Sequence, residues 1–126
     1  MANPIQSRMI MFKKLSKDFS KIPFGRSKID GKDNGTKFRE VHLRKWVSDC
    51  LASDEHLELD LNDLDIPMTS SFMEESFGGL IRFGYVEKAD LLRILKLKSD
   101  DMSYIYEINE YISNAIQDPS AIKYDM

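Results

Sequence analysis

The order of secondary structure is clearest in residues 57–81, which read LELDLNDLDIPMTSSFMEESFGGLI. Over 57–61, leucines alternate with acidic residues, a period of two that is typical of a strand with one buried face. A turn is predicted at 63–67, which reads DLDIP and ends in Pro67. From about Ser71, four apolar side chains repeat at helical spacing, namely Met73, Phe77, Leu80 and Ile81. The segment therefore predicts a strand, a turn and a helix in succession.

The flanking segments extend this alternation in both directions. The apolar run 9–12 predicts a first strand, and residues 91–97 fit a third. A helix is predicted to begin near Thr36, with one apolar face made of Leu43, Trp46, Val47, Cys50 and Leu51. A last helix is predicted from about Asp100, with one side made of Ile105, Ile108, Ile112, Ala115 and Ile116. Residues 22–35 are rich in Gly, Asp, Asn, Lys and Ser and predict a loop that is long enough to suspect a function.

The alternation of strands and helices predicts an α/β fold. Strands that are separated by single helices need crossover connections, which are parallel and right-handed within one sheet. We therefore expect a small layered fold, with a mostly parallel sheet of about three to five strands and three main helices packed on it. The domain is expected to span residues 9–117, with a flexible N-terminal tail at 1–8 and a C-terminal tail at 118–126.

Composition narrows the function classes. The chain has 126 residues, 42% hydrophobic and 31% charged, which suits one soluble globular domain. No apolar run approaches the roughly 20 residues that span a bilayer, and the first eight residues lack the order of a secretory signal, so we expect a cytoplasmic protein. The single cysteine, Cys50, excludes an internal disulfide, and its place on an apolar helix face predicts a buried structural thiol. No metal site and no cofactor are predicted, since the two histidines have no ligand spacing and the glycine-rich loop matches neither a P-loop nor a calcium loop.

Charge is distributed unevenly along the chain. Residues 1–45 hold twelve Lys/Arg and four Asp/Glu, a balance of +8, and residues 46–126 carry −11, giving a total of −3. The basic part could contact nucleic acid, an acidic lipid surface or the acidic remainder of the same chain. The negative total and a pI of about 5.4 favour the last interpretation. Neither nucleic acid nor a membrane is an expected partner.

Two neighbouring serines, Ser70 and Ser71, are candidate phosphorylation sites. Ser71 and Glu74 have the spacing of a capping box, in which each side chain accepts a backbone N–H of the other residue. Ser70 then precedes the cap and is expected to be exposed near the positive end of the helix dipole, where backbone amides could hold a phosphate. The alternative is that the two serines only begin a helix after a proline turn.

The pair Gly78-Gly79 stands inside the same predicted helix. Each glycine costs the helix about 1 kcal/mol relative to alanine, so another group is expected to approach this backbone closely. Either the sheet or another chain could be that group. Glu74 and Glu75 point about 100° apart on a helix and are expected to be solvated rather than to form an acid/base pair.

Several short segments resemble the small bacterial and phage STAS-like family of unknown function. The resemblance covers about residues 9–117 and is carried by Asp18-Phe19-Ser20, Pro23, Gly25-Arg26, Asp30-Gly31, Gly35, Phe38-Arg39-Glu40, Leu59-Asp60-Leu61 and, most specifically, the run from Ser70 to Leu80. The family is distantly related to STAS domains of anti-anti-sigma factors, which place a phosphorylatable serine at the start of a helix after a central strand. Ser70 takes that position here. Members occur beside or fused to histidine-kinase-type ATPase modules, so the resemblance implies a protein partner of that kind.

The resemblance implies a regulatory interaction module and not an enzyme. The predicted partner- or ligand-contacting residues are Gly25, Arg26, Asp30, Gly31, Gly35, Arg39, Phe72 and Glu75. The predicted structural residues of the motif are Ser71, Glu74, Phe77, Gly78 and Gly79. The alternative function is a small-molecule or nucleotide sensor that uses the Gly25–Gly35 loop and a helix N-terminus as an anion pocket.

Overall fold

A computed structural model describes residues 9–126 and contains one parallel sheet. The strands are β1 (Ile10–Lys14), β2 (His56–Asp60) and β3 (Leu95–Lys98), in the spatial order β1-β2-β3. In the register of this sheet, Phe12 lies beside Glu58, which lies beside Lys96. The predicted α/β class and parallel sheet are confirmed. The predicted N-terminal tail, residues 1–8, lies outside the described residues.

Two helices have a π-helical turn in the middle. The first runs without interruption through α3 (Gly35–Lys37), the π-helical η1 (Phe38–Leu43) and α4 (Arg44–Ala52). The second runs through α5 (Ser70–Met73), the π-helical η2 (Glu74–Gly78) and α6 (Gly79–Arg82). The remaining helices are α2 (Leu15–Asp18), α7 (Lys88–Ile94) and α8 (Met102–Asn114). The two π-helical segments lie against each other, so the widened turns face one another inside the fold.

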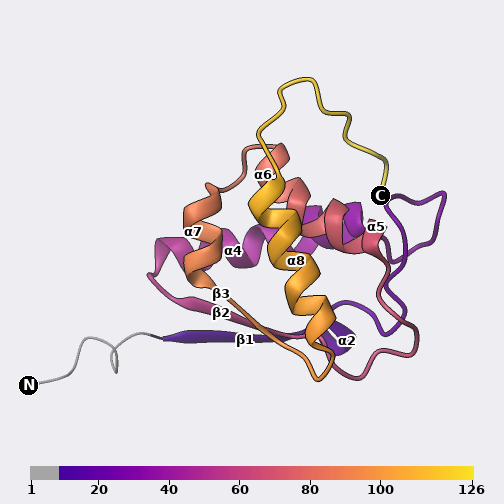
Figure 1. Cartoon of the computed structure of the whole chain (residues 1–126), viewed down its shortest axis with the longest axis horizontal. Coiled ribbons are helices and arrows are strands. Elements are labelled where there is room, and N and C mark those ends of the chain that lie inside the picture. Colours follow the sequence, from indigo (N-terminus) through magenta and orange to yellow (C-terminus); the bar gives the residue numbers. More distant parts are fainter. Residues whose placement is uncertain (1–8) are drawn as a thin grey trace, which may run out of the picture.

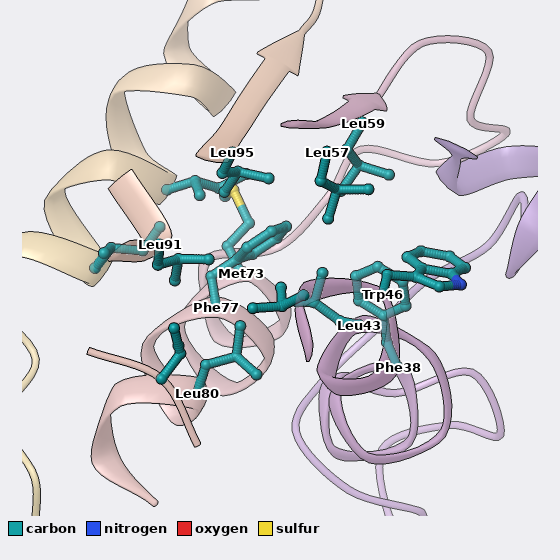
Figure 2. Packing of buried hydrophobic residues seen from close by; sticks show 14 of the residues in the cluster. Phe38, Leu43, Trp46, Leu57, Leu59, Met73, Phe77, Leu80, Leu91 and Leu95 are labelled. Carbon is teal, nitrogen blue, oxygen red and sulfur yellow. The ribbon is translucent and has the colours of Figure 1, made fainter. Parts of the chain in front are cut away.

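The long helices cover one face of the sheet, as Figure 1 shows with the sheet below and α4 to α8 above it. The buried face of β2 consists of Leu57 and Leu59, which confirms the predicted alternation. These leucines meet the aromatic side chains of the first two long helices, among them Phe38, Trp46 and Phe77 (Figure 2). Cys50 belongs to the same cluster and is fully buried, as predicted.

The third predicted strand is wrong in its first half. Residues 91–94 belong to α7, and only Leu95–Lys98 form a strand. Leu91 and Ile94 are both buried, and their spacing of three puts them on one face of a helix. A short apolar run fits a buried helix end as well as a strand, and packing against α4 decides between the two here.

The other differences concern helix ends. The last helix stops at Asn114, so Ala115 and Ile116 lie beyond it, and Ile116 is exposed. The short helix α2 has no counterpart in the prediction, and the helices are more numerous than the three expected. Within residues 9–126, no helix has the length and apolar character that crossing a bilayer would require.

Candidate functional site

The second long helix begins one residue earlier than predicted. Thr69 is its N-cap, and the Thr69 Oγ1 atom accepts a hydrogen bond from the backbone N–H of Phe72 at 3.3 Å. The predicted capping box of Ser71 and Glu74 is therefore wrong. With Thr69 as the cap, the third helical position is Phe72, which carries no carboxylate to complete such a box.

The two serines of the candidate site differ in exposure. Ser70 is the first residue of the helix and is exposed, and its hydroxyl donates to the Glu107 Oε2 atom of α8 at 3.0 Å. The same carboxylate oxygen accepts the Tyr111 hydroxyl at 3.1 Å. Ser71 is half-buried, and its Oγ lies 3.2 Å from the Thr69 Oγ1 atom. Ser70 is thus the more reachable of the two candidate phosphorylation sites.

The glycine-rich loop of residues 22–35 is folded back on itself and fixed to the second long helix. Gly25 has a φ of +77°, which suits glycine, and the Gly25 carbonyl accepts the N–H of Gly35 at 2.8 Å. The Asp30 carboxylate accepts the N–H of Arg26 at 2.8 Å. A methyl group on Gly35 would lie 2.9 Å from the Phe72 carbonyl, so the loop and the helix are in direct contact.

Arg26 reaches from this loop into a cluster of ionic side chains, which we call the charge cluster and which consists of Arg26, Arg39, Arg82, Glu74 and Glu75. Arg26 Nη1 lies 2.6 Å from Glu74 Oε1 and 3.0 Å from Glu75 Oε1. Arg39 Nη1 donates to Glu75 Oε2 at 2.8 Å and to the Glu75 carbonyl at 2.6 Å. Arg82 Nη1 lies 2.5 Å from Glu74 Oε2.

The charge cluster is mostly buried, against the expectation that Glu74 and Glu75 are solvated. Arg39 is 0% exposed and Glu75 is 1% exposed, while Glu74 is half-buried. Burial alone would raise the pKa of Glu74, but hydrogen bonds from Arg82 and Arg26 outweigh it and leave the pKa below the ordinary value of 4.5. Each glutamate of the charge cluster is therefore paired with arginine side chains inside the protein.

Most of the predicted contact residues are buried. Gly25, Gly35, Arg39, Phe72 and Glu75 are all buried in this structure, and their role in contact with a partner or ligand stays a prediction. Arg26 and Gly31 are half-buried and Asp30 is exposed. The structure thus brings the loop and the helix together as predicted, but uses them chiefly to support each other.

Arg39 explains the pair Gly78-Gly79. A methyl group on Gly79 would lie 2.5 Å from Arg39 Nη1, so the close neighbour is neither the sheet nor another chain. A methyl group on Gly78 would lie 2.8 Å from Glu74 Oε2. The Arg39 Nη2 atom is buried without a hydrogen-bond partner among residues 9–126, and the guanidinium carbon lies 4.6 Å from the centroid of the Phe83 ring.

Part of the charge asymmetry of the chain is resolved by these pairs. Lys14 pairs with Asp63, Arg26 with Glu74 and Arg39 with Glu75, so basic residues of the first part meet acidic residues of the second. This is the self-complementary interpretation of the sequence. The sequence analysis did not predict that Arg39 is buried. The glycine pair indicated that some group approaches this helix closely, and the structure identifies that group as the Arg39 side chain.

A comparison with protein families matches residues 35–104 to the STAS-like domain of unknown function (DUF4325). The chain belongs to this family. The matched STAS-like region begins with the first long helix and ends in α8, so it contains β2, Ser70 and all of the charge cluster except Arg26. No curated protein and no solved structure matches the chain significantly.

Proposed function

We propose that this STAS-like protein is a regulatory interaction module whose contact with a partner protein is switched by phosphorylation of Ser70. The observation that carries the proposal is the position of the Ser70 hydroxyl, which is exposed at the first turn of the helix after β2 and donates to Glu107 of α8. This is the position that STAS domains use for their phosphorylated serine.

A phosphate on Ser70 would change this site in two opposing ways. It removes the hydroxyl donor and adds about −1.5 to −2 charges beside the Glu107 carboxylate, whose oxygen lies 3.0 Å from the Ser70 Oγ atom. The helix dipole and the amides of the first turn attract the phosphate. The expected outcome is a phosphate that is held at the helix start while the contact between α5 and α8 is lost, so both charge and shape change on this surface.

The charge cluster supports such a local switch because it fixes the helix from the other side. Glu75 is buried five residues after Ser70 on the same helix, and it pairs at 2.8 Å with the buried Arg39 of the first long helix. Repulsion at the exposed first turn is therefore expected to alter the surface without unfolding the helix. The proposal assigns binding and switching to this surface and no catalytic step.

The partner that we propose is a histidine-kinase-type ATPase module, which would also transfer the phosphate from ATP. The test co-expresses the protein with such an ATPase encoded beside it and measures complex formation and ATP-dependent mass increase. A phosphate should appear on the wild-type chain and on Ser71→Ala, and should be absent from Ser70→Ala. Absence of both a complex and a mass increase would refute the switch, as would a phosphate that persists on Ser70→Ala.

The alternative, an anion sensor, is tested by thermal shift with nucleotides. Arg26 and Arg82 are engaged by Glu74, and the cavity of about 330 Å³ beside them is lined by both signs of charge. We therefore expect no saturable rise in melting temperature. A saturable rise that disappears in Arg26→Ala would favour the sensor over the switch.

A further inference from the structure

The segment 118–126 lies across the protein although it has no helix or strand. After α8 ends, the backbone N–H of Asp118 donates to the Arg82 carbonyl at 2.9 Å. Farther along, the Asp125 carbonyl accepts the N–H of Lys28 at 3.2 Å. In Figure 1 the yellow chain runs from the end of α8 to a point beside the purple loop that contains Lys28. We call this segment the strap.

Between these two attachments the strap places Lys123 on a site made of Glu40, Phe83 and Tyr85, which we call the lysine pocket. The Lys123 Nζ atom lies 3.3 Å from Glu40 Oε1, 5.6 Å from the Phe83 ring centroid and 5.4 Å from that of Tyr85. The Phe83 and Tyr85 rings are stacked with centroids 5.9 Å apart, and the Tyr85 hydroxyl donates to Glu40 Oε1 at 3.1 Å. Two aromatic rings and a carboxylate are a combination that attracts an ammonium group.

The pocket suits lysine better than arginine. The second oxygen of the carboxylate, Glu40 Oε2, already accepts the Arg39 Nε atom at 2.9 Å. Glu40 Oε1 contacts Lys123 and also lies 3.4 Å from Arg44 Nη1, whose guanidinium carbon is 3.8 Å from the Tyr85 ring centroid. A further guanidinium binds a carboxylate best through two parallel hydrogen bonds, and Glu40 has no free pair of oxygens for them. A compact ammonium needs one oxygen. Consistent with this fit, the pKa of Lys123 is raised, first by its hydrogen bond with Tyr85 and also by the charge of Glu40.

The strap fills this surface incompletely. A cavity of about 330 Å³ remains between it and the charge cluster, lined by Arg26, Glu74, Glu75 and Arg82 on one side and by strap residues from Asp118 to Tyr124 on the other. The apolar side chain of Ile122 is 77% exposed. The ion pair that Lys28 and Asp125 add is also exposed, and such pairs hold a segment weakly. A segment that filled the cavity would gain contacts that the strap does not make.

We propose that Glu40, Phe83 and Tyr85 are a recognition site for the lysine of an extended segment of a partner protein, and that Lys123 occupies this site within the same chain until the partner displaces it. The site adds a second surface to the interaction module. It lies at the end of the helix opposite Ser70 and needs no phosphate. An experiment can therefore refute the lysine site without refuting the Ser70 switch, and the reverse.

The test measures binding of a fluorescent nine-residue probe, DPSAIKYDM, which is the strap itself, to the full chain by anisotropy. A tethered ligand has an effective concentration in the millimolar range. Suppose that the probe binds the lysine pocket with a Kd of about 0.1 mM when Lys123 is absent from it. A strap with an effective concentration of about 1 mM then weakens binding of the probe to the wild-type chain roughly tenfold. Lys123→Ala, which vacates the pocket, should therefore bind the probe about tenfold more tightly than the wild-type chain does.

Lys28→Ala is the matched control, because it removes one lysine that touches the strap and leaves Lys123 in the pocket. It should bind the probe as the wild-type chain does. A second probe with alanine in place of the lysine should bind Lys123→Ala at least tenfold more weakly than the first probe. Equal affinity of the two probes, or equal affinity of wild type and Lys123→Ala for the first, would overturn the proposal. If the wild-type chain dimerised by exchanging straps, the occupant would be a second copy of this chain, and the proposal of a different partner protein would be overturned.

Discussion

Alanine at Gly79 should destabilise the protein, whereas alanine at the adjacent Gly78 should leave its stability nearly unchanged. The two glycines belong to the same helix, and each replacement gains about 1 kcal/mol of helix propensity. Their surroundings differ. A methyl group on Gly79 would lie 2.5, 3.0 and 3.2 Å from Nη1, Cδ and Cζ of Arg39.

The magnitude follows from how firmly Arg39 is held. Its side chain is fully buried and donates to the carbonyl and the carboxylate of Glu75, so it cannot move away from a methyl group without weakening those bonds. Overpacking costs about 1–3 kcal/mol, and a lost hydrogen bond to a charged group costs about 1.5–3 kcal/mol. After the gain in propensity, Gly79→Ala should lose about 2–4 kcal/mol of the free energy of unfolding.

Gly78→Ala meets a side chain that can give way. Its methyl group would contact Glu74 Oε2 at 2.8 Å, and Glu74 is half-buried and still able to rotate toward solvent. The cost is a weaker pair between Glu74 and Arg82, which is worth about as much as the propensity that is gained. The expected change is within about 1 kcal/mol of zero.

Urea unfolding of the three chains, followed by circular dichroism, measures these differences directly. The melting temperature should fall by roughly 3–5 °C for each kcal/mol lost in a domain of this size. If Gly79→Ala were as stable as Gly78→Ala, Arg39 would not be fixed against this backbone, and the account of the glycine pair would be refuted.

Three further predictions concern the same interior. Arg39→Met should lose about 3 kcal/mol of the free energy of unfolding in urea, because the buried Glu75 carboxylate loses its main partner. Adding Glu75→Met should restore part of this stability. A further loss of stability in the double variant would contradict the pairing. The pKa of Glu74 is lowered in the folded state, so its contribution to stability is present above about pH 4.5 and is lost as the pH falls through its folded pKa. Between about pH 6 and about pH 3, Glu74→Gln should therefore lose less of its free energy of unfolding than the wild-type chain does. Burial raises the pKa of Cys50 to about 11, so a thiol reagent at about pH 8 should label the chain only in denaturant, and rapid labelling of the native chain would contradict this.

The site could be predicted only in part, and Ser70 and Arg39 illustrate the limit. Ser70 was predicted to lie at the start of a helix after β2 and to be exposed, and the structure has both features. The cap itself was misplaced by two residues, since Thr69, Ser70 and Ser71 all carry hydroxyls that can cap a helix. Arg39 was predicted to contact a partner or ligand, whereas the structure buries it against Glu75, a residue distant in sequence. Arginine is rarely buried without such a partner.

Periodicity was sufficient to predict the α/β class, the parallel sheet and the first two long helices. An element that buries one face has apolar residues at a spacing of 2 or 3.6 residues, and this pattern can be read from the local sequence. The charge cluster and the lysine pocket have no such periodic pattern, and the apolar run in α7 fits a strand as well as a helix. Each depends on groups far apart in the chain: Leu91 packs in a core built largely from other helices, Arg39 meets Glu75, and Lys123 meets Glu40. Whether a charge is buried or solvated depends on whether its counter-ion is brought within about 4 Å, and that distance exists only once the chain has folded.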